Sequence, residues 1–141
     1  MVNMLEIEKT LLEEVYNHGI KTYPDECCGI MLGTIAGENR TVKKIFPAEN
    51  LNKERSKDRY ELNQKDFLRA DREAQSLDLE IVGIYHSHPD HPSKASETDR
   101  QKAHESYSYL IVAIHQGKFY SKNSWVLDSE KQFHEENIVE V

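Results

Sequence analysis

The stretch HSHPDHPSKASETD, residues 86–99, places three histidines directly after the apolar run IVGIY. In a β-strand the side chains of residues i and i+2 point to the same side, so His86 and His88 can direct two imidazoles at one point. Asp99 is expected in the first turn of a following helix, and a loop closed by two prolines can return it to that point. Two histidines and one carboxylate would leave a tetrahedral zinc ion with one open position for water, which is the catalytic pattern.

A zinc hydrolase also needs a general base, and a carboxylate that does not bind the metal is the usual choice. Glu26 is the candidate, because this charge stands directly before CCGIMLG, a run expected to form the first buried strand. Asp99 also has a purely structural interpretation, together with Ser96, which stands three residues before it. In the helix start S-E-T-D, the serine hydroxyl would cap a backbone N–H, and the helix dipole would favour the aspartate.

The apolar pattern predicts three helices between β-strands. A first helix is expected from Met4 to about Gly19, and a second is expected after the N-cap Asn63. A third helix, capped by Ser96, is expected to end near residue 105. The charged segment 51–59 is expected to be an exposed loop. Strands are expected over residues 27–33, 40–50, 60–62, 79–85, 107–115, 118–128 and 133–141, the last two with the alternation typical of edge strands.

Length, charge and cysteine content narrow the fold and function classes. At 141 residues the chain fits a single α/β domain over residues 1–141, with one mixed β-sheet sandwiched by helices. Its net charge of −7 predicts no binding to nucleic acid or to an anionic membrane. Cys27 and Cys28 are adjacent and cannot form an ordinary disulfide with each other, which favours a reducing cytoplasm. The first residues lack the basic and uninterrupted apolar segments of a signal peptide or a membrane span.

The candidate residues together resemble a known motif. Glu26, the sequence His86-Ser87-His88-Pro89, Ser96 and Asp99 are similar to the JAMM, or MPN-plus, metalloprotease motif E…HxHP…SxxD, with the expected seven residues between the second histidine and the serine. Flanking segments such as PDECCGIMLG and YSYLIVAI resemble those of small stand-alone prokaryotic members. The resemblance implies a cytidine-deaminase-like fold and one Zn²⁺ per chain, held by His86, His88 and Asp99. It also implies that Glu26 is the catalytic acid and base, and that Ser96 helps to stabilise the oxyanion.

A member of this family is expected to be a zinc peptidase or isopeptidase that cleaves the amide bond after the C-terminal Gly-Gly of a ubiquitin-like protein. Resemblance to the stand-alone group implies a narrower substrate, a sulfur-carrier protein joined to cysteine, from which cysteine is released. Removal of ubiquitin-like tags from proteins is the competing reaction. The alternative from a different class is a non-catalytic MPN scaffold module in a larger assembly. Members of that kind typically lack some of the ligands that this chain retains. The sequence leaves the physiological substrate and the oligomeric state open.

Other residues near or outside the motif are interpreted structurally. His91 lies inside the motif and is expected to be a solvated loop residue, with a place at the substrate entrance as the alternative. Cys28 is expected to be a small buried strand residue rather than a metal ligand. The other four histidines have no spacing that would bring them to the site: His18, His104, His115 and His134.

Overall fold

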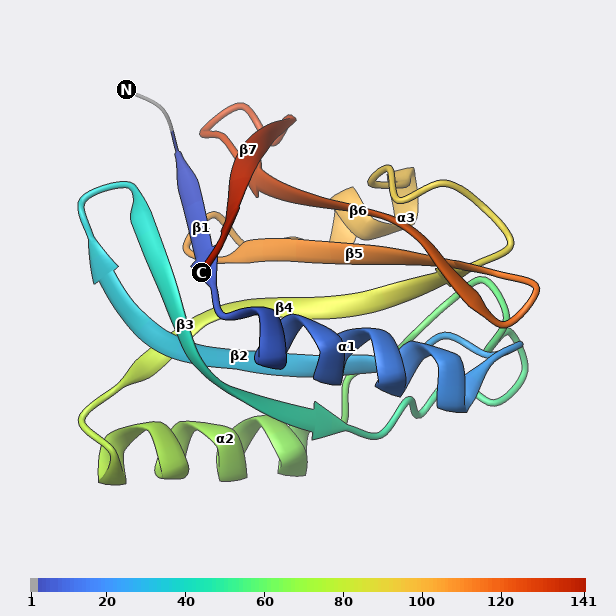
Figure 1. The fold of residues 1–141 in the computed structure, drawn as a ribbon, viewed down its shortest axis with the longest axis horizontal. Helices are drawn as coiled ribbons and strands as arrows, with labels where there is room; N and C mark the ends of the chain where they lie inside the picture. The colour runs from blue at the N-terminus through green and yellow to red at the C-terminus, as the bar shows by residue number, and fades with distance from the viewer. Residues whose placement is uncertain (1–2) are drawn as a thin grey trace.

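Residues 3–141 are described by a computed structural model, and they form three helices and one β-sheet (Figure 1). The elements in chain order are β1 (Met4–Ile7), α1 (Lys9–Thr22), β2 (Cys28–Ala36), β3 (Asn39–Ala48), α2 (Gln64–Ser76), β4 (Glu80–Pro89), α3 (Glu97–Lys102), β5 (Ser108–His115), β6 (Lys118–Leu127) and β7 (Phe133–Glu140). The prediction of a mixed α/β fold with a single sheet is confirmed.

The sheet closes on itself, which the sequence did not predict. Its strand order is β1-β3-β2-β4-β5-β6-β7, and β1 pairs in parallel with both β3 and β7. Because β1 joins these two strands, the sheet is a closed barrel rather than an open layer between helices. Closure leaves no strand of residues 3–141 at an edge of this sheet, so the expectation of two edge strands near the C-terminus is wrong.

The predicted start of the first helix, at Met4, is wrong, because residues Met4–Ile7 form strand β1. Leu5 and Ile7 are buried and alternate with the partly exposed Met4 and Glu6, which is the two-residue period of a strand. The apolar residues of this segment also satisfy helical spacing, and pairing with two neighbouring strands decides between the alternatives. Helix α1 begins only at Lys9.

Other predicted boundaries also differ from the structure, and β2, expected to end at residue 33, continues to Ala36. Residues 60–62 are not a strand, because only an isolated bridge joins Leu62 to Asn50. Helix α3 ends at Lys102 rather than near residue 105, since the next residue already has an extended backbone. Strand β4 continues past the predicted end at residue 85 as far as Pro89.

Strand β4 packs against both long helices, α1 and α2. It lies between the antiparallel strand β2 and the parallel strand β5. Helices α1 and α2 pack on opposite faces, since Val15 of α1 and Ala74 of α2 belong to different core clusters (Figure 1). Within β4, Tyr85 joins the α1 cluster and Ile84 joins the α2 cluster. This two-sided burial explains the uniformly apolar sequence of the strand.

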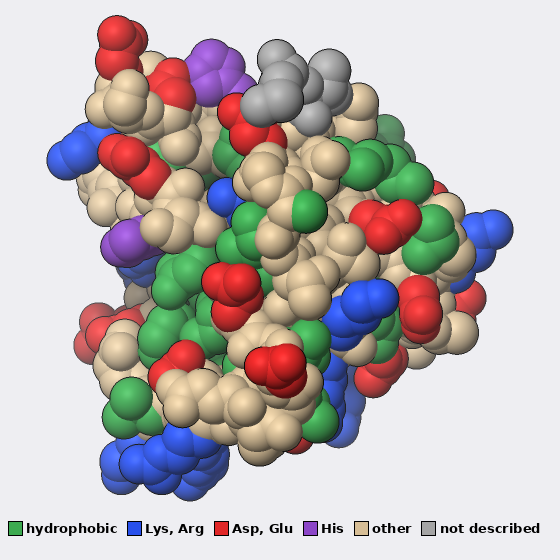
Figure 2. Space-filling view, turned by 90° about the vertical axis from the view of Figure 1, so that its left-hand side faces the viewer, with side chains coloured by type: hydrophobic (Ala, Val, Ile, Leu, Met, Phe, Trp, Pro, Cys, Tyr) green, Lys and Arg blue, Asp and Glu red, His purple; other side chains and the backbone are tan. Residues whose placement is uncertain are grey.

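The surface shows mixed charge. Figure 2 shows the face at the left of Figure 1, where acidic side chains are spread among other residues and Lys and Arg gather mainly at the lower edge. Among the described residues drawn there, no broad basic surface of the kind that nucleic acid requires is seen. None of the helices within residues 3–141 combines the length and apolar character needed to cross a membrane.

Gly33 in β2 provides a test of the barrel packing. A Cβ atom on Gly33 would lie 1.7 Å from the Thr41 carbonyl oxygen of β3, a backbone atom that cannot rotate away. Gly33→Ala is therefore expected to lower the free energy of unfolding by about 1–3 kcal/mol. Urea denaturation followed by Trp125 fluorescence measures this change. The exposed neighbour Thr34→Ala is the control, and equal stability of Gly33→Ala and wild type would contradict the packing described.

Candidate metal centre

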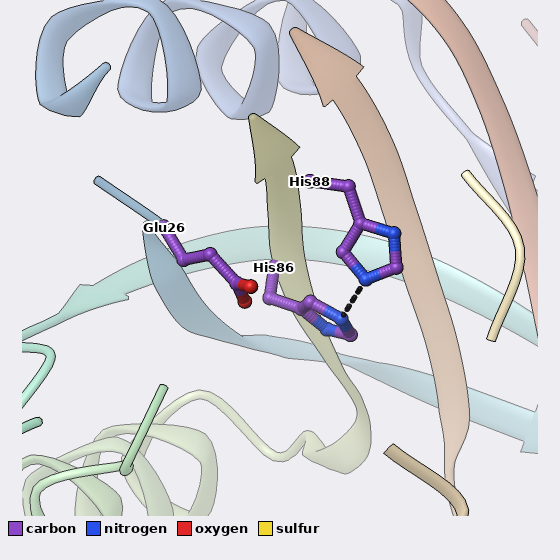
Figure 3. A group of neighbouring side chains, drawn as sticks. All are labelled: Glu26, His86 and His88. Carbon is purple, nitrogen blue, oxygen red and sulfur yellow. Dashed lines mark hydrogen bonds between the residues drawn. The ribbon is translucent and has the colours of Figure 1, made fainter. Parts of the chain in front are cut away.

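The two motif histidines lie within β4 rather than beyond its end. Because β4 pairs with β5 without a register shift from Gly83 to Pro89, His86 and His88 point to the same side of the sheet (Figure 3). Their side chains are almost completely buried, with exposed fractions of 0% and 2%. The two Nε2 atoms are 3.1 Å apart. The strand itself therefore brings the imidazoles together.

Asp99 reaches the same point from α3. Its Oδ1 lies 3.2 Å from His86 Nε2, and its Oδ2 lies 3.2 Å from His88 Nε2. The Asp99 carboxylate also accepts the Ser96 N–H at 2.8 Å, while Ser96 Oγ accepts the Asp99 N–H at 3.0 Å. The capping box and the approach to the histidines are both present, so the structural and metal-binding interpretations of Asp99 do not exclude each other.

The loop that leads from β4 to α3 is held against the barrel by the buried Ser93. Its hydroxyl donates to Asn123 Oδ1 at 2.5 Å and lies 2.8 Å from Ser121 Oγ. Its carbonyl accepts the Trp125 indole N–H at 3.1 Å. These bonds fix where α3 begins, and with it the position of Asp99.

Glu26 lies beside the histidines because β2 runs antiparallel to β4. The register pairs Cys28 with His86, so the residue two positions before Cys28 is next to the end of β4. Glu26 is 3% exposed, and one ligand atom from each of Glu26, His86 and His88 lies within 4.8 Å of the others (Figure 3). The Glu26 N–H donates to the Ser56 carbonyl at 2.6 Å, which fixes its backbone against the charged loop.

The pKa values of the two carboxyl groups are shifted in opposite directions. Burial raises the pKa of Glu26 to about 8, so in the metal-free protein this group is mostly protonated at neutral pH. Burial also opposes ionisation of Asp99, but the nearby His86 and His88 and the Ser96 N–H outweigh it and hold the pKa of Asp99 well below its ordinary value. Asp99 is thus always ionised near neutral pH, whereas Glu26 can exchange a proton there.

The donor set fits a tetrahedral zinc ion. Ligands about 2.0–2.1 Å from such an ion lie about 3.3 Å from one another. Here the two histidine Nε2 atoms are 3.1 Å apart, and each lies 3.2 Å from a different oxygen of the Asp99 carboxylate. His88 Nδ1 donates to the Pro92 carbonyl at 2.7 Å, which leaves the lone pair of Nε2 free in the neutral ring. His86, His88 and Asp99 could therefore hold the metal, and Glu26, whose carboxyl oxygen lies within 4.8 Å of a nitrogen of each histidine, is the candidate base.

Two further rings stack on the histidines of the site, and only one of them, His91, was considered near the site from the sequence. The Tyr60 ring centroid lies 4.6 Å from that of His86, and the His91 centroid lies 4.1 Å from that of His88. His91 is half-buried by this contact, so a simple solvated loop position does not describe it. Tyr60 stands in an irregular segment, and no spacing rule relates it to residue 86. The free thiol of Cys28 is buried, as predicted.

Known proteins resemble this chain over most of its length. The chain is 30% identical to a desampylase of Pyrococcus furiosus over 114 residues, which are 81% of this chain and 75% of that protein. It is 32% identical to a CysO-cysteine peptidase of Mycobacterium bovis over 111 residues, which are 79% of this chain and 73% of that one. The solution structure of protein DSY2949 from Desulfitobacterium hafniense matches with a TM-score of 0.86 and 26% identity, covering 98% of this chain and 93% of that chain. The profile of prokaryotic homologs of the JAB domain matches residues 8–128, and the chain therefore belongs to this family.

Proposed function

We propose that residues 1–141 form one JAMM/MPN metalloprotease domain, a zinc-dependent peptidase or isopeptidase. It hydrolyses the amide bond after the C-terminal Gly-Gly of a ubiquitin-like or sulfur-carrier protein. The observation that carries the proposal is the meeting of buried donor atoms from His86, His88 and Asp99 at 3.1–3.2 Å, beside the buried carboxyl of Glu26. Three protein ligands of this kind are typical of catalytic zinc sites, because one position remains open.

Each residue of the site has one role in the proposed reaction. Zn²⁺ held by His86, His88 and Asp99 would supply Lewis acidity, which activates water at neutral pH and polarises the amide carbonyl. Glu26 takes the proton of the attacking water and returns it to the leaving amine. Ser96 Oγ accepts the Asp99 N–H but keeps its own hydrogen, which it donates to the oxyanion.

Two relatives support the choice of substrate. One is named a desampylase, and the other is named a CysO-cysteine peptidase. From the second name we infer release of cysteine from a sulfur-carrier adduct, with removal of ubiquitin-like tags from proteins as the competing reaction. An extended Gly-Gly tail suits a buried site, because glycine lets the substrate backbone approach without side-chain clashes.

The proposed location is the cytoplasm. Cys27 and Cys28 are free thiols, and burial raises the pKa of each to about 12, so both remain protonated at neutral pH. Unpaired buried thiols are typical of proteins that work in a reducing compartment.

Intact-mass spectrometry tests the substrate. A ubiquitin-like sulfur carrier with a C-terminal cysteine is incubated with the zinc-loaded protein, and the expected product is the carrier shortened by that cysteine. An unchanged carrier mass, in a sample that holds zinc, would contradict the cysteine-releasing reaction and direct the assay to a tag joined to lysine. An unchanged mass in a protein that binds no zinc would support the scaffold alternative.

Glu26→Gln tests the base. The amide cannot accept the proton of the attacking water, so turnover is expected to fall by about 100-fold or more while zinc remains bound. Hydrolysis rate and zinc content are measured on the same sample. The exposed Glu61→Gln is the matched control and is expected to behave like the wild type. Retained hydrolysis in Glu26→Gln would remove Glu26 from the mechanism.

Asp99→Asn tests the metal ligands. The amide can still accept the Ser96 N–H, but it lacks the charge that favours Zn²⁺, so zinc affinity is expected to fall about tenfold or more. Competition with a chromophoric chelator measures the affinity. His134, whose side chain is 64% exposed, provides the control His134→Ala. Equal zinc affinity in Asp99→Asn and wild type would show that the carboxylate does not bind the metal.

Two substitutions of Ser96 separate capping from catalysis. Glycine at an N-cap costs only a few tenths of a kcal/mol, whereas alanine costs about 1 kcal/mol. If Ser96 stabilises the oxyanion, Ser96→Gly and Ser96→Ala both lose turnover, by about 100-fold for one donor. If it is only a cap, Ser96→Gly keeps wild-type turnover and Ser96→Ala is merely less stable. Hydrolysis rates and urea unfolding of both variants decide between the two roles.

A further inference from the structure

The two histidines of the metal centre are oriented in different ways. A metal-binding histidine normally donates its second ring N–H to an oxygen atom, which fixes the rotation of the ring. His88 follows this rule through its Nδ1 bond of 2.7 Å to the Pro92 carbonyl. His86 does not, because its Nδ1 is buried and has no hydrogen-bond partner within residues 3–141. Apart from the contacts of Nε2 itself with Asp99 and His88, the His86 ring therefore needs another interaction to fix its rotation.

Tyr60 supplies that interaction. Its ring lies against the His86 imidazole, with centroids 4.6 Å apart and an interplanar angle of 27°. A flat ring packed on one face of the imidazole opposes its rotation, since turning would drive the imidazole edge into the Tyr60 ring. Tyr60 is itself 7% exposed, and the Lys102 ammonium lies 5.0 Å from its ring centroid and hydrogen-bonds its carbonyl.

Asn50 holds the segment that carries Tyr60. Its Nδ2 donates to the Arg59 carbonyl at 3.1 Å, and its Oδ1 accepts the Glu61 N–H at 3.0 Å. These two bonds bracket Tyr60 in the chain. The same Nδ2 lies 3.2 Å from the Glu26 carbonyl and donates to it. One partly buried amide group thus connects the segment of the stacking ring with the segment of the proposed general base.

We propose that Tyr60 is the positioning residue of the metal-binding His86, and that Asn50 keeps Tyr60 in place relative to Glu26. The inference rests on the proposed zinc site, and it names the residues that orient a ligand rather than bind the metal. Tyr60 acts through the flat face of its ring. Its hydroxyl group has no part in this role.

Substitutions that separate the ring from the hydroxyl test the proposal. Tyr60→Leu removes the flat face and is expected to weaken Zn²⁺ binding by about 10–100-fold, measured by competition with a chromophoric chelator. Tyr60→Phe keeps the stacked ring and is expected to bind zinc like the wild type. In the Co²⁺-substituted protein, Tyr60→Leu is expected to change the visible absorption bands, which report ligand geometry. Asn50→Ala is expected to weaken zinc binding in the same direction.

Tyr107→Leu is the matched control, because Tyr107 packs in the same core cluster, next to His104. It is expected to lower the thermal midpoint of the metal-free protein and to leave zinc affinity unchanged. Tyr60→Met, whose unbranched side chain adapts more easily to an irregular space, replaces Tyr60→Leu if the latter does not fold. If the folded Tyr60 variant has the zinc affinity and the Co²⁺ spectrum of the wild type, the positioning role of Tyr60 is overturned. The proposed function is not affected by that outcome. A wild-type protein that binds no zinc would overturn the proposed function itself.

Discussion

Two side chains separated by one residue in a β-strand must point to the same side of the sheet, and the site depends on this constraint. His86 and His88 obey it because β4 pairs with β5 without a register shift from Gly83 to Pro89. The intervening Ser87 must then point to the opposite face, where its buried hydroxyl accepts the Cys27 N–H at 2.8 Å. That bond joins the end of β4 to the start of β2, next to Glu26. The alternation of side chains along β4 therefore places both histidines and helps to place Glu26, the proposed base.

A central strand is an unfavourable place for polar groups, because each one that is buried without a partner costs free energy. The site meets much of this cost by sharing partners, although the buried His86 Nδ1 has none within residues 3–141. The Asp99 carboxylate caps α3 through the Ser96 N–H and faces both imidazoles, while His88 donates to a backbone carbonyl. Glu26, which has no such set of partners, is kept mostly neutral by burial. The donor atoms are thus held together by the protein alone, so a metal ion can bind with little rearrangement.

The candidate site could be predicted from the sequence more fully than the fold. The meeting of His86 and His88 follows from strand period, and the helix start S-E-T-D predicts where Asp99 lies. The closed barrel could not be predicted, because β1 has only four residues and its apolar positions fit a helix equally well. This error did not affect the site. Strand β1 pairs with residues 39–42 of β3 and with β7, whereas the site is built from β4, the start of β2 and α3.

Tyr60 shows why the rest of the site could not be predicted. Its contact with His86 depends on Asn50 closing an irregular loop, and such tertiary contacts leave no periodic pattern in the sequence. The packing of β4 nevertheless explains how the Tyr60 ring comes to lie against His86. Ile84, two residues before His86 on the same face of the strand, belongs with Tyr60 to the core cluster under α2. That core therefore continues to the candidate metal centre, where His86 is packed like a core residue on one side and faces Asp99 with its Nε2. A ligand held in this way keeps one orientation, which a metal site with fixed geometry requires.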